Sequence, residues 1–158
     1  MGGELSIFRV AGPLVVRESG PTLGGVWLNV GDAPFPQERW NDFVHVVLAS
    51  AVQALTHASV GRMAAIHFFD GPFEVRIAGV ANGLLSFEAR ERRLAGTVVV
   101  RQAQVSIQIA CASLLQAVEE ALALGDAAGD GSTVGLRSSL PELRRLVETH
   151  SRSEKGDA

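Results

Sequence analysis

Hydrophobic residues recur with two different spacings along this sequence, and this constrains its fold more than any other feature. Between residues 73 and 77, apolar and charged residues alternate, as expected for a strand with one buried face. After Pro36 the spacing becomes three and four, which is typical of an amphipathic helix. The stripe comprises Trp40, Phe43, Val44, Val47, Leu48, Ala51 and Leu55. The chain therefore combines strands with at least one long helix.

Turn residues divide the remaining sequence into short segments. Gly12-Pro13, Asp70-Gly71 and Asn82-Gly83 each predict a turn between two strands. The predicted strands are 5–10, 14–17, 25–31, 63–69, 73–77, 85–90 and 101–108. The predicted helices are one of about five turns after Pro36 with Glu38 in its first turn, one at 110–124, and a short one capped by Ser139.

Helices separated in sequence from a run of antiparallel strands indicate an α+β fold. We expect a β-meander sheet packed by the long first helix and the C-terminal helices, in two layers. A chain of 158 residues can build such a core as a single domain. We place this domain at residues 1–150 and a disordered tail at 151–158, with solvated or flexible loops at 90–96 and 125–135.

The composition limits the classes of function. Fourteen basic and 17 acidic residues give a net charge of −3, so the sequence predicts no general attraction to nucleic acid. Polar residues interrupt every long apolar run, so we expect no membrane span. The N-terminal residues lack the pattern of a secretory signal, and the single Cys111 cannot form an internal disulfide. We therefore expect a cytoplasmic protein.

The hydrophobic fraction is 47%, with only 20% charged residues. That composition favours an apolar surface that a partner, a second copy of the chain or a ligand covers. A homodimer is one expected form of this association.

The sequence contains no established metal or catalytic motif. His45 and His57 are twelve residues apart on the first helix and point in different directions, and the other two histidines are distant in sequence. We expect no metal ion and no other cofactor. Cys111 lies in an apolar segment and is predicted to be a core residue rather than a nucleophile.

Two pairs of polar residues could still form a site. Asp42 and His45 are three apart on the predicted helix and could share a hydrogen bond, although a solvated helix face explains them more simply. His67 could reach Asp70, although a histidine with satisfied hydrogen bonds in the sheet and an aspartate in the turn explain these two residues more simply.

The stretch PFPQERWNDF, residues 34–43, is rich in aromatic residues. Phe35 and Trp40 are predicted to anchor the start of the helix, and an aromatic rim beside Asp42 is the functional alternative. A cluster of three arginines, Arg90, Arg92 and Arg93, alternates with glutamates. It favours a solvated loop over a contact with an anionic ligand.

Two segments carry a resemblance to a known group of proteins. FPQERWNDFVHVVLASAVQAL and IHFFDGPFEVRI look like the FPxxxWxDF helix start and the FxDGP hairpin of small uncharacterised bacterial proteins, some of them similar to immunity proteins of toxin systems. These segments cover about a quarter of the chain. The resemblance implies a compact α+β binding protein and transfers no active-site residue.

We therefore expect a non-enzymatic, cytoplasmic protein-binding module, immunity-like in covering a partner. The alternative is a small-molecule binding protein or minor enzyme with a pocket between the sheet and the first helix. The candidate residues for binding a ligand or partner are Phe35, Trp40, Asp42, His45, His67 and Asp70. No catalytic residue is assigned.

Overall fold

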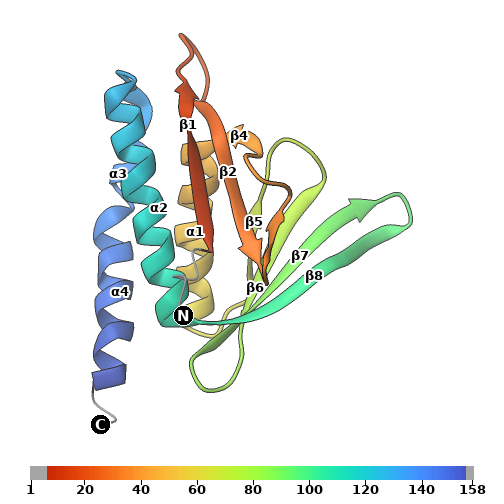
Figure 1. The fold of residues 1–158 in the computed structure, drawn as a ribbon. Helices are drawn as coiled ribbons and strands as arrows, with labels where there is room; N and C mark the ends of the chain where they lie inside the picture. Colours follow the sequence, from red (N-terminus) through yellow and green to blue (C-terminus); the bar gives the residue numbers. More distant parts are fainter. Residues whose placement is uncertain (1–6, 156–158) are drawn as a thin grey trace.

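The computed structural model of this protein describes residues 7–155 (Figure 1). The first sheet consists of β1 (Phe8–Val15), β2 (Leu23–Val30), β3 (Ala33–Phe35) and β4 (Asn41–Phe43). The second consists of β5 (Ala64–His67), β6 (Phe73–Gly79), β7 (Leu84–Arg93) and β8 (Gly96–Ser106). The helices are α1 (Val44–Ser59), α2 (Ile107–Ala127), α3 (Val134–Arg137) and α4 (Leu140–Lys155).

The predicted α+β class is confirmed, and both four-stranded sheets are antiparallel. In the first sheet β2 is central and pairs with β1, β3 and β4. The second sheet is the predicted meander, with its strands in the order β5-β6-β7-β8. The N-terminal strands form a separate sheet instead of extending this meander.

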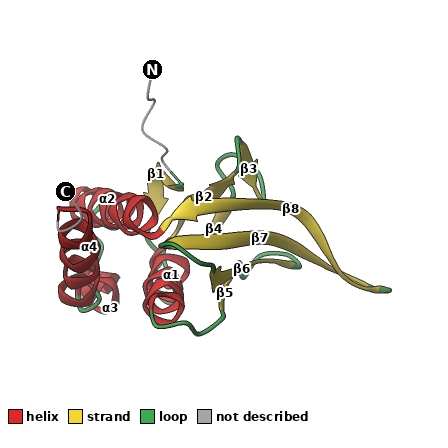
Figure 2. Ribbon diagram, turned by 90° about the horizontal axis from the view of Figure 1, so that it is seen from below, coloured by secondary structure: helices red, strands yellow, loops and turns green. Residues whose placement is uncertain are grey.

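The helices stand together on one side of the molecule and the strands on the other (Figures 1 and 2). Helix α1 packs against β5 and β6, whereas α2 packs against β1 and α4. Apolar side chains from both sheets and all four helices form one buried cluster, which includes Leu28, Leu55, Phe87 and Leu114. Because α1 contributes to the same cluster as both sheets, the strands and helices share one core.

Helix α2 is the only helix in residues 7–155 whose length and apolar composition would suit a membrane span. In this fold, 44% of its most apolar window is buried inside the protein. A core helix has the same composition, so these properties do not assign α2 to a membrane.

The strands predicted at 5–10 and 14–17 are one strand, β1, whose pairing with β2 is irregular between Ala11 and Val15. Pro13 lies in this interval, and proline has no N–H to donate to the ladder. The irregularity therefore interrupts the strand without ending it. The first residues of the predicted 5–10 strand lie outside the described residues.

The predicted start of the first helix is wrong. The helix begins at Val44, and the preceding three residues form β4, in which Asp42 pairs with Gly24. Trp40 also belongs to this connection, since its carbonyl accepts a hydrogen bond from the backbone N–H of Val26 at 2.8 Å. Pairing with β2 thus overrides the helical spacing, and Glu38 is not in the first helical turn.

The segment 90–96, predicted as a solvated loop, is mostly strand, although residues 92–96 are exposed as predicted. Strand β7 continues through Arg93, with Arg92 opposite Thr97 and Arg93 opposite Gly96 in β8. Gly96 has a φ of 122°, which glycine adopts without the strain of a side chain. The charged residues therefore lie on a long hairpin instead of in a loop.

The region 125–135, predicted as a flexible connection, has regular structure. Gly125 lies inside α2, and a 3₁₀ turn at Gly131–Thr133 leads into α3. A Cβ on Gly125 would lie 3.0 Å from Cγ2 of Thr133, so glycine permits the close approach of this turn. At the C-terminus α4 runs through Lys155, so residues 151–155, assigned to the tail from sequence, are helical. The last three residues lie outside the described residues.

Candidate functional site

The aromatic residues of the PFPQERWNDF stretch pack against the second sheet. Phe35 is 3% exposed, and its ring centroid lies 5.6 Å from that of Phe73 on β6. Trp40 lies 5.3 Å from the same ring, edge to face. This geometry is favourable for aromatic pairs, and it joins the β3–β4 connection to the second sheet.

Asp42 is a buried carboxylate with four hydrogen bonds. Its Oδ2 accepts from the indole N–H of Trp40 at 3.1 Å and from the backbone N–H groups of Phe69 at 2.9 Å and Asp70 at 3.1 Å. Its Oδ1 accepts from the backbone N–H of Phe43 at 2.7 Å. Asp42 therefore ties β4 to the β5–β6 turn and does not act as a free base.

His45 is hydrogen-bonded to Asp130 and not to Asp42, so the hydrogen bond that the sequence allowed between Asp42 and His45 does not form. The Nε2 of His45 lies 2.9 Å from Oδ2 of Asp130, which follows α2. Asp42 is 1% exposed and His45 is 8% exposed. The solvated helix face expected from the sequence is therefore wrong for both residues.

Asp130 is the centre of a buried polar cluster that sequence reasoning missed. Its Oδ2 also accepts from the hydroxyl of Thr22 at 2.7 Å. Its Oδ1 accepts from the backbone N–H of Ser132 at 2.8 Å and from the hydroxyl of Ser132 at 2.6 Å. The cluster holds together the β1–β2 connection, α1 and the turn after α2.

Burial alone would raise the pKa of Asp130. Hydrogen bonds from Ser132, Thr22 and His45 outweigh that effect and hold the pKa of this carboxyl well below its ordinary value. The group is therefore a stable carboxylate. The other ring nitrogen of His45, Nδ1, is buried and has no hydrogen-bond partner among the described residues, so no hydroxyl or thiol there is hydrogen-bonded to it.

The two remaining candidates lie at the surface. His67 has a 54% exposed side chain, and its Nδ1 lies 3.5 Å from Oε2 of Glu74, so it pairs with Glu74 and not with Asp70. Asp70 is exposed in the β5–β6 turn. Asp42 and Asp70 line a hollow of about 290 Å³ together with Arg17, Leu23, Asn41, Phe43 and Phe69. Phe35, Trp40, His45 and His67 do not line this hollow.

The buried thiol and the metal-ligating residue types are two further candidates for a site. Cys111 is fully buried, and burial raises the pKa of its thiol to about 12. Within residues 7–155, no group of three or more histidine, cysteine, aspartate or glutamate side chains is placed to hold a metal ion.

The β7–β8 hairpin projects away from the helices (Figure 2). Leu94, at its turn, is fully exposed. In β8 three consecutive residues, Val98, Val99 and Val100, are 39%, 46% and 44% exposed, and we call them the valine edge. Among the described residues β8 pairs only with β7, so its other edge has no strand partner there.

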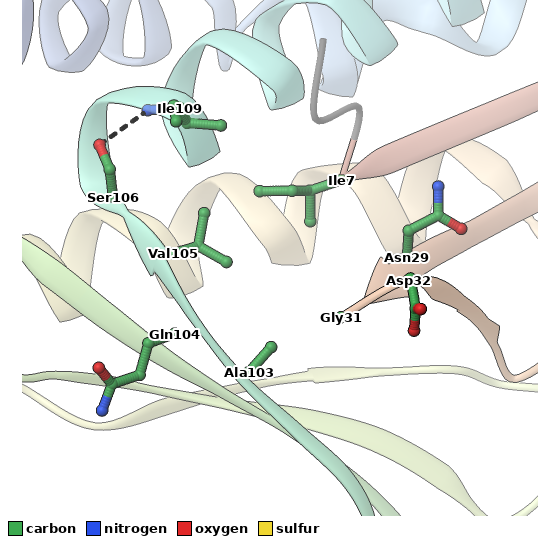
Figure 3. Close-up of a pocket in the computed structure, with 9 residues that line it drawn as sticks. All are labelled: Ile7, Asn29, Gly31, Asp32, Ala103, Gln104, Val105, Ser106 and Ile109. Carbon is green, nitrogen blue, oxygen red and sulfur yellow. Dashed lines mark hydrogen bonds between the residues drawn. The ribbon is translucent and has the colours of Figure 1, made fainter. Parts of the chain in front are cut away.

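A cleft of about 340 Å³ lies between the two sheets beside β8, and we call it the inter-sheet cleft. Its lining residues are Ile7, Asn29, Gly31, Asp32, Ala103, Gln104, Val105, Ser106 and Ile109. In Figure 3, Ile7 and Val105 point toward one another across the cleft, whereas Gln104 points away. The centre of the cleft is therefore apolar.

Comparisons of the chain with protein-family models, with curated proteins and with solved structures found no match.

Proposed function

We propose that this protein is a non-enzymatic, cytoplasmic protein-binding module that uses the β7–β8 hairpin, and that it is immunity-like in covering its partner. The valine edge carries the proposal. An exposed, β-branched strand edge is a ready template for pairing with another chain, and natural proteins usually protect such edges. Here three exposed valines and the exposed Leu94 lie on one projecting element.

The buried polar groups support the same proposal. The carboxylates of Asp42 and Asp130 are saturated with internal hydrogen bonds, and Cys111 is buried. These groups stabilise the fold, whereas the exposed apolar groups of the hairpin have no internal role in the described chain. Surfaces of that kind mark sites of association.

The test is site-specific photocrosslinking in the cell that makes the protein. A benzophenone amino acid is placed at Leu94 or Val99, and at Val134 as a matched control. Val134 is 72% exposed and apolar but lies on α3, away from the hairpin. We expect a discrete protein adduct from the hairpin positions and none from Val134. Equal adducts at all three positions, or none at the hairpin, would contradict the proposal.

The proposal that the protein is immunity-like is tested separately, by inhibition of the partner. The captured partner is purified, and its activity is measured with increasing amounts of this protein. We expect inhibition by the unmodified protein and loss of inhibition by Val99→Lys, since a lysine on a strand edge opposes further pairing. An adduct with a second copy of this chain would show a homodimer instead.

A further inference from the structure

We propose that β8 binds an extended, acidic segment of the partner by strand addition, and that apolar side chains of this segment fill the inter-sheet cleft. The inference rests on the proposed function and specifies which kind of partner segment the protein binds. Three features of the structure carry it: the free edge of β8, the position of the cleft, and the charge of the hairpin.

The pairing register of β8 shows where an added strand would lie. Ala89 is opposite Arg101 and Arg90 is opposite Val99, so Val100 forms a bulge. Beyond the bulge, residues 101–106 pair regularly with β7. This regular part is about 20 Å long at the usual rise of a strand, which suits a segment of about six residues.

The inter-sheet cleft lies on the face that such a segment would share. Ala103 is opposite Phe87 and Val105 is opposite Leu85, and both β7 residues belong to the core. Side chains of an added strand would lie about 4.8 Å from those of β8 on the same face. Alternate side chains of that strand would therefore point into the cleft lined by Ala103 and Val105, with Ile7 and Ile109 opposite.

The cleft favours apolar side chains on the segment. Its volume of about 340 Å³ is within the range of natural ligand sites. Ile109 is 38% exposed beside it, so filling the cleft removes apolar surface from water. We therefore assign apolar residues to two alternate positions, i and i+2, of the bound segment.

The charge of the hairpin favours acidic residues next to them. Residues 84–106 contain four arginines and two glutamates, although the chain as a whole is acidic. Arg90 and Arg92 are opposite Val99 and Thr97, one strand away from the free edge and beyond one end of the 101–106 register, so they would face residues that flank the paired segment. The Nε and Nη1 of Arg90 are buried without a hydrogen-bond partner among the described residues, and Glu74 lies 3.8 Å from Nη1. An acidic side chain would complement this charge.

The same charge argues against a second copy as the occupant. Pairing β8 with β8 of another copy would bring two arginine-rich hairpins together, and like charges at an interface oppose association. An acidic strand from a different protein meets no such repulsion from the hairpin, and Asp32 is the one acidic residue that lines the cleft.

The test is selection of binding peptides from a random dodecapeptide library on the full chain, followed by affinity measurements with the selected peptides. We expect peptides with apolar residues at i and i+2 and with flanking aspartate or glutamate. Ile109→Glu and Arg92→Glu should each weaken their binding at least tenfold. The matched controls Val134→Glu on α3 and Arg145→Glu on α4, both at exposed positions, should change it less than twofold.

Hydrogen exchange on the unmodified protein gives a readout that does not depend on the variants. A bound strand should protect backbone amides within 101–106. The inference would be overturned if the selected peptides lack acidic residues, bind Ile109→Glu normally or leave residues 101–106 unprotected. A selection that enriches no peptide, or self-association of the protein through β8, would also overturn it. If the inference fails but the photocrosslinking experiment still gives adducts between the hairpin and a protein partner, the proposed function holds without it.

Discussion

The Nε2 of His45 lies 2.9 Å from Oδ2 of Asp130, although 85 residues separate the two in the chain. The contact joins the first turn of α1 to the turn that follows α2. Because Thr22 donates to the same carboxylate oxygen, the β1–β2 connection is held at this point too. Three segments that are distant in sequence thus depend on one carboxylate.

This arrangement predicts how stability depends on pH. The pKa of Asp130 is lowered in the folded protein: burial opposes the shift, but the hydrogen bonds from Ser132, Thr22 and His45 exceed it. A group with a lowered folded pKa stabilises the protein above its unfolded pKa, near 4, and this contribution is lost as pH falls below that value. The free energy of unfolding should therefore decrease below about pH 4.

The variant Asp130→Asn isolates this contribution. We expect it to be less stable than the unmodified protein by about 2 kcal/mol at pH 7, because a neutral amide accepts these hydrogen bonds less well and presents its own N–H groups to the donors. Urea unfolding measured from pH 7 to pH 2 should show the difference shrinking below pH 4. A difference that stays constant over this range would contradict the assignment.

Asp42 should be as important for stability, for a different reason. Asp42→Ala leaves the N–H groups of Phe43, Phe69 and Asp70 without their acceptor, and we expect a loss of about 3 kcal/mol. Asp42→Asn should cost less, since its amide oxygen can replace Oδ2, which accepts three of the four hydrogen bonds. Urea unfolding of both variants tests the order, and equal losses would be the contrary result.

The fold class could be predicted because regular patterns dominate the second sheet. Phe73, Val75 and Ile77 alternate with charged residues, and this spacing is the strand β6. Helix α1 is similarly evident from Val47, Leu48 and the following apolar stripe. In these elements local pattern and tertiary packing favour the same structure.

The buried polar contacts could not be predicted, because their partners are remote in sequence. Asp130 lies in a glycine-rich segment that is typical of a flexible loop, and only its approach to Thr22 and His45 makes it a core residue. Asp42 likewise follows a helical spacing until β2 provides a strand partner. The free edge of β8 depends on which strands pair, and hydrophobic spacing does not determine this.

Ser113 allows a comparison of two serines that both accept backbone hydrogen bonds. Its hydroxyl is buried in α2 and accepts from the backbone N–H groups of Ile7 at 2.9 Å and Phe8 at 3.0 Å. Ser113→Ala leaves both donors without this acceptor in the core, and we expect it to cost about 2 kcal/mol.

Ser106 is the matched control, because its hydroxyl accepts only one, longer hydrogen bond, from Ile109 at 3.4 Å, at the exposed start of the same helix. Ser106→Ala should cost about 0.5 kcal/mol. Urea unfolding measures both losses, and hydrogen exchange at Ile7 and Phe8 should accelerate only in Ser113→Ala. Equal losses would show that the β1 contact does not depend on this hydroxyl.

Cys111 provides a probe of unfolding that needs no mutation. The residue is 0% exposed, and burial raises the pKa of its thiol to about 12. In the folded state the thiol is therefore protonated and out of reach of reagents. We expect a disulfide reagent at pH 8 to leave the native protein unmodified and to label Cys111 rapidly in urea. Because labelling requires opening of the core, the logarithm of its rate should rise in Ser113→Ala in proportion to the lost stability, provided that reclosing is fast. Rapid labelling of the unmodified native protein would mean that the core opens locally around α2.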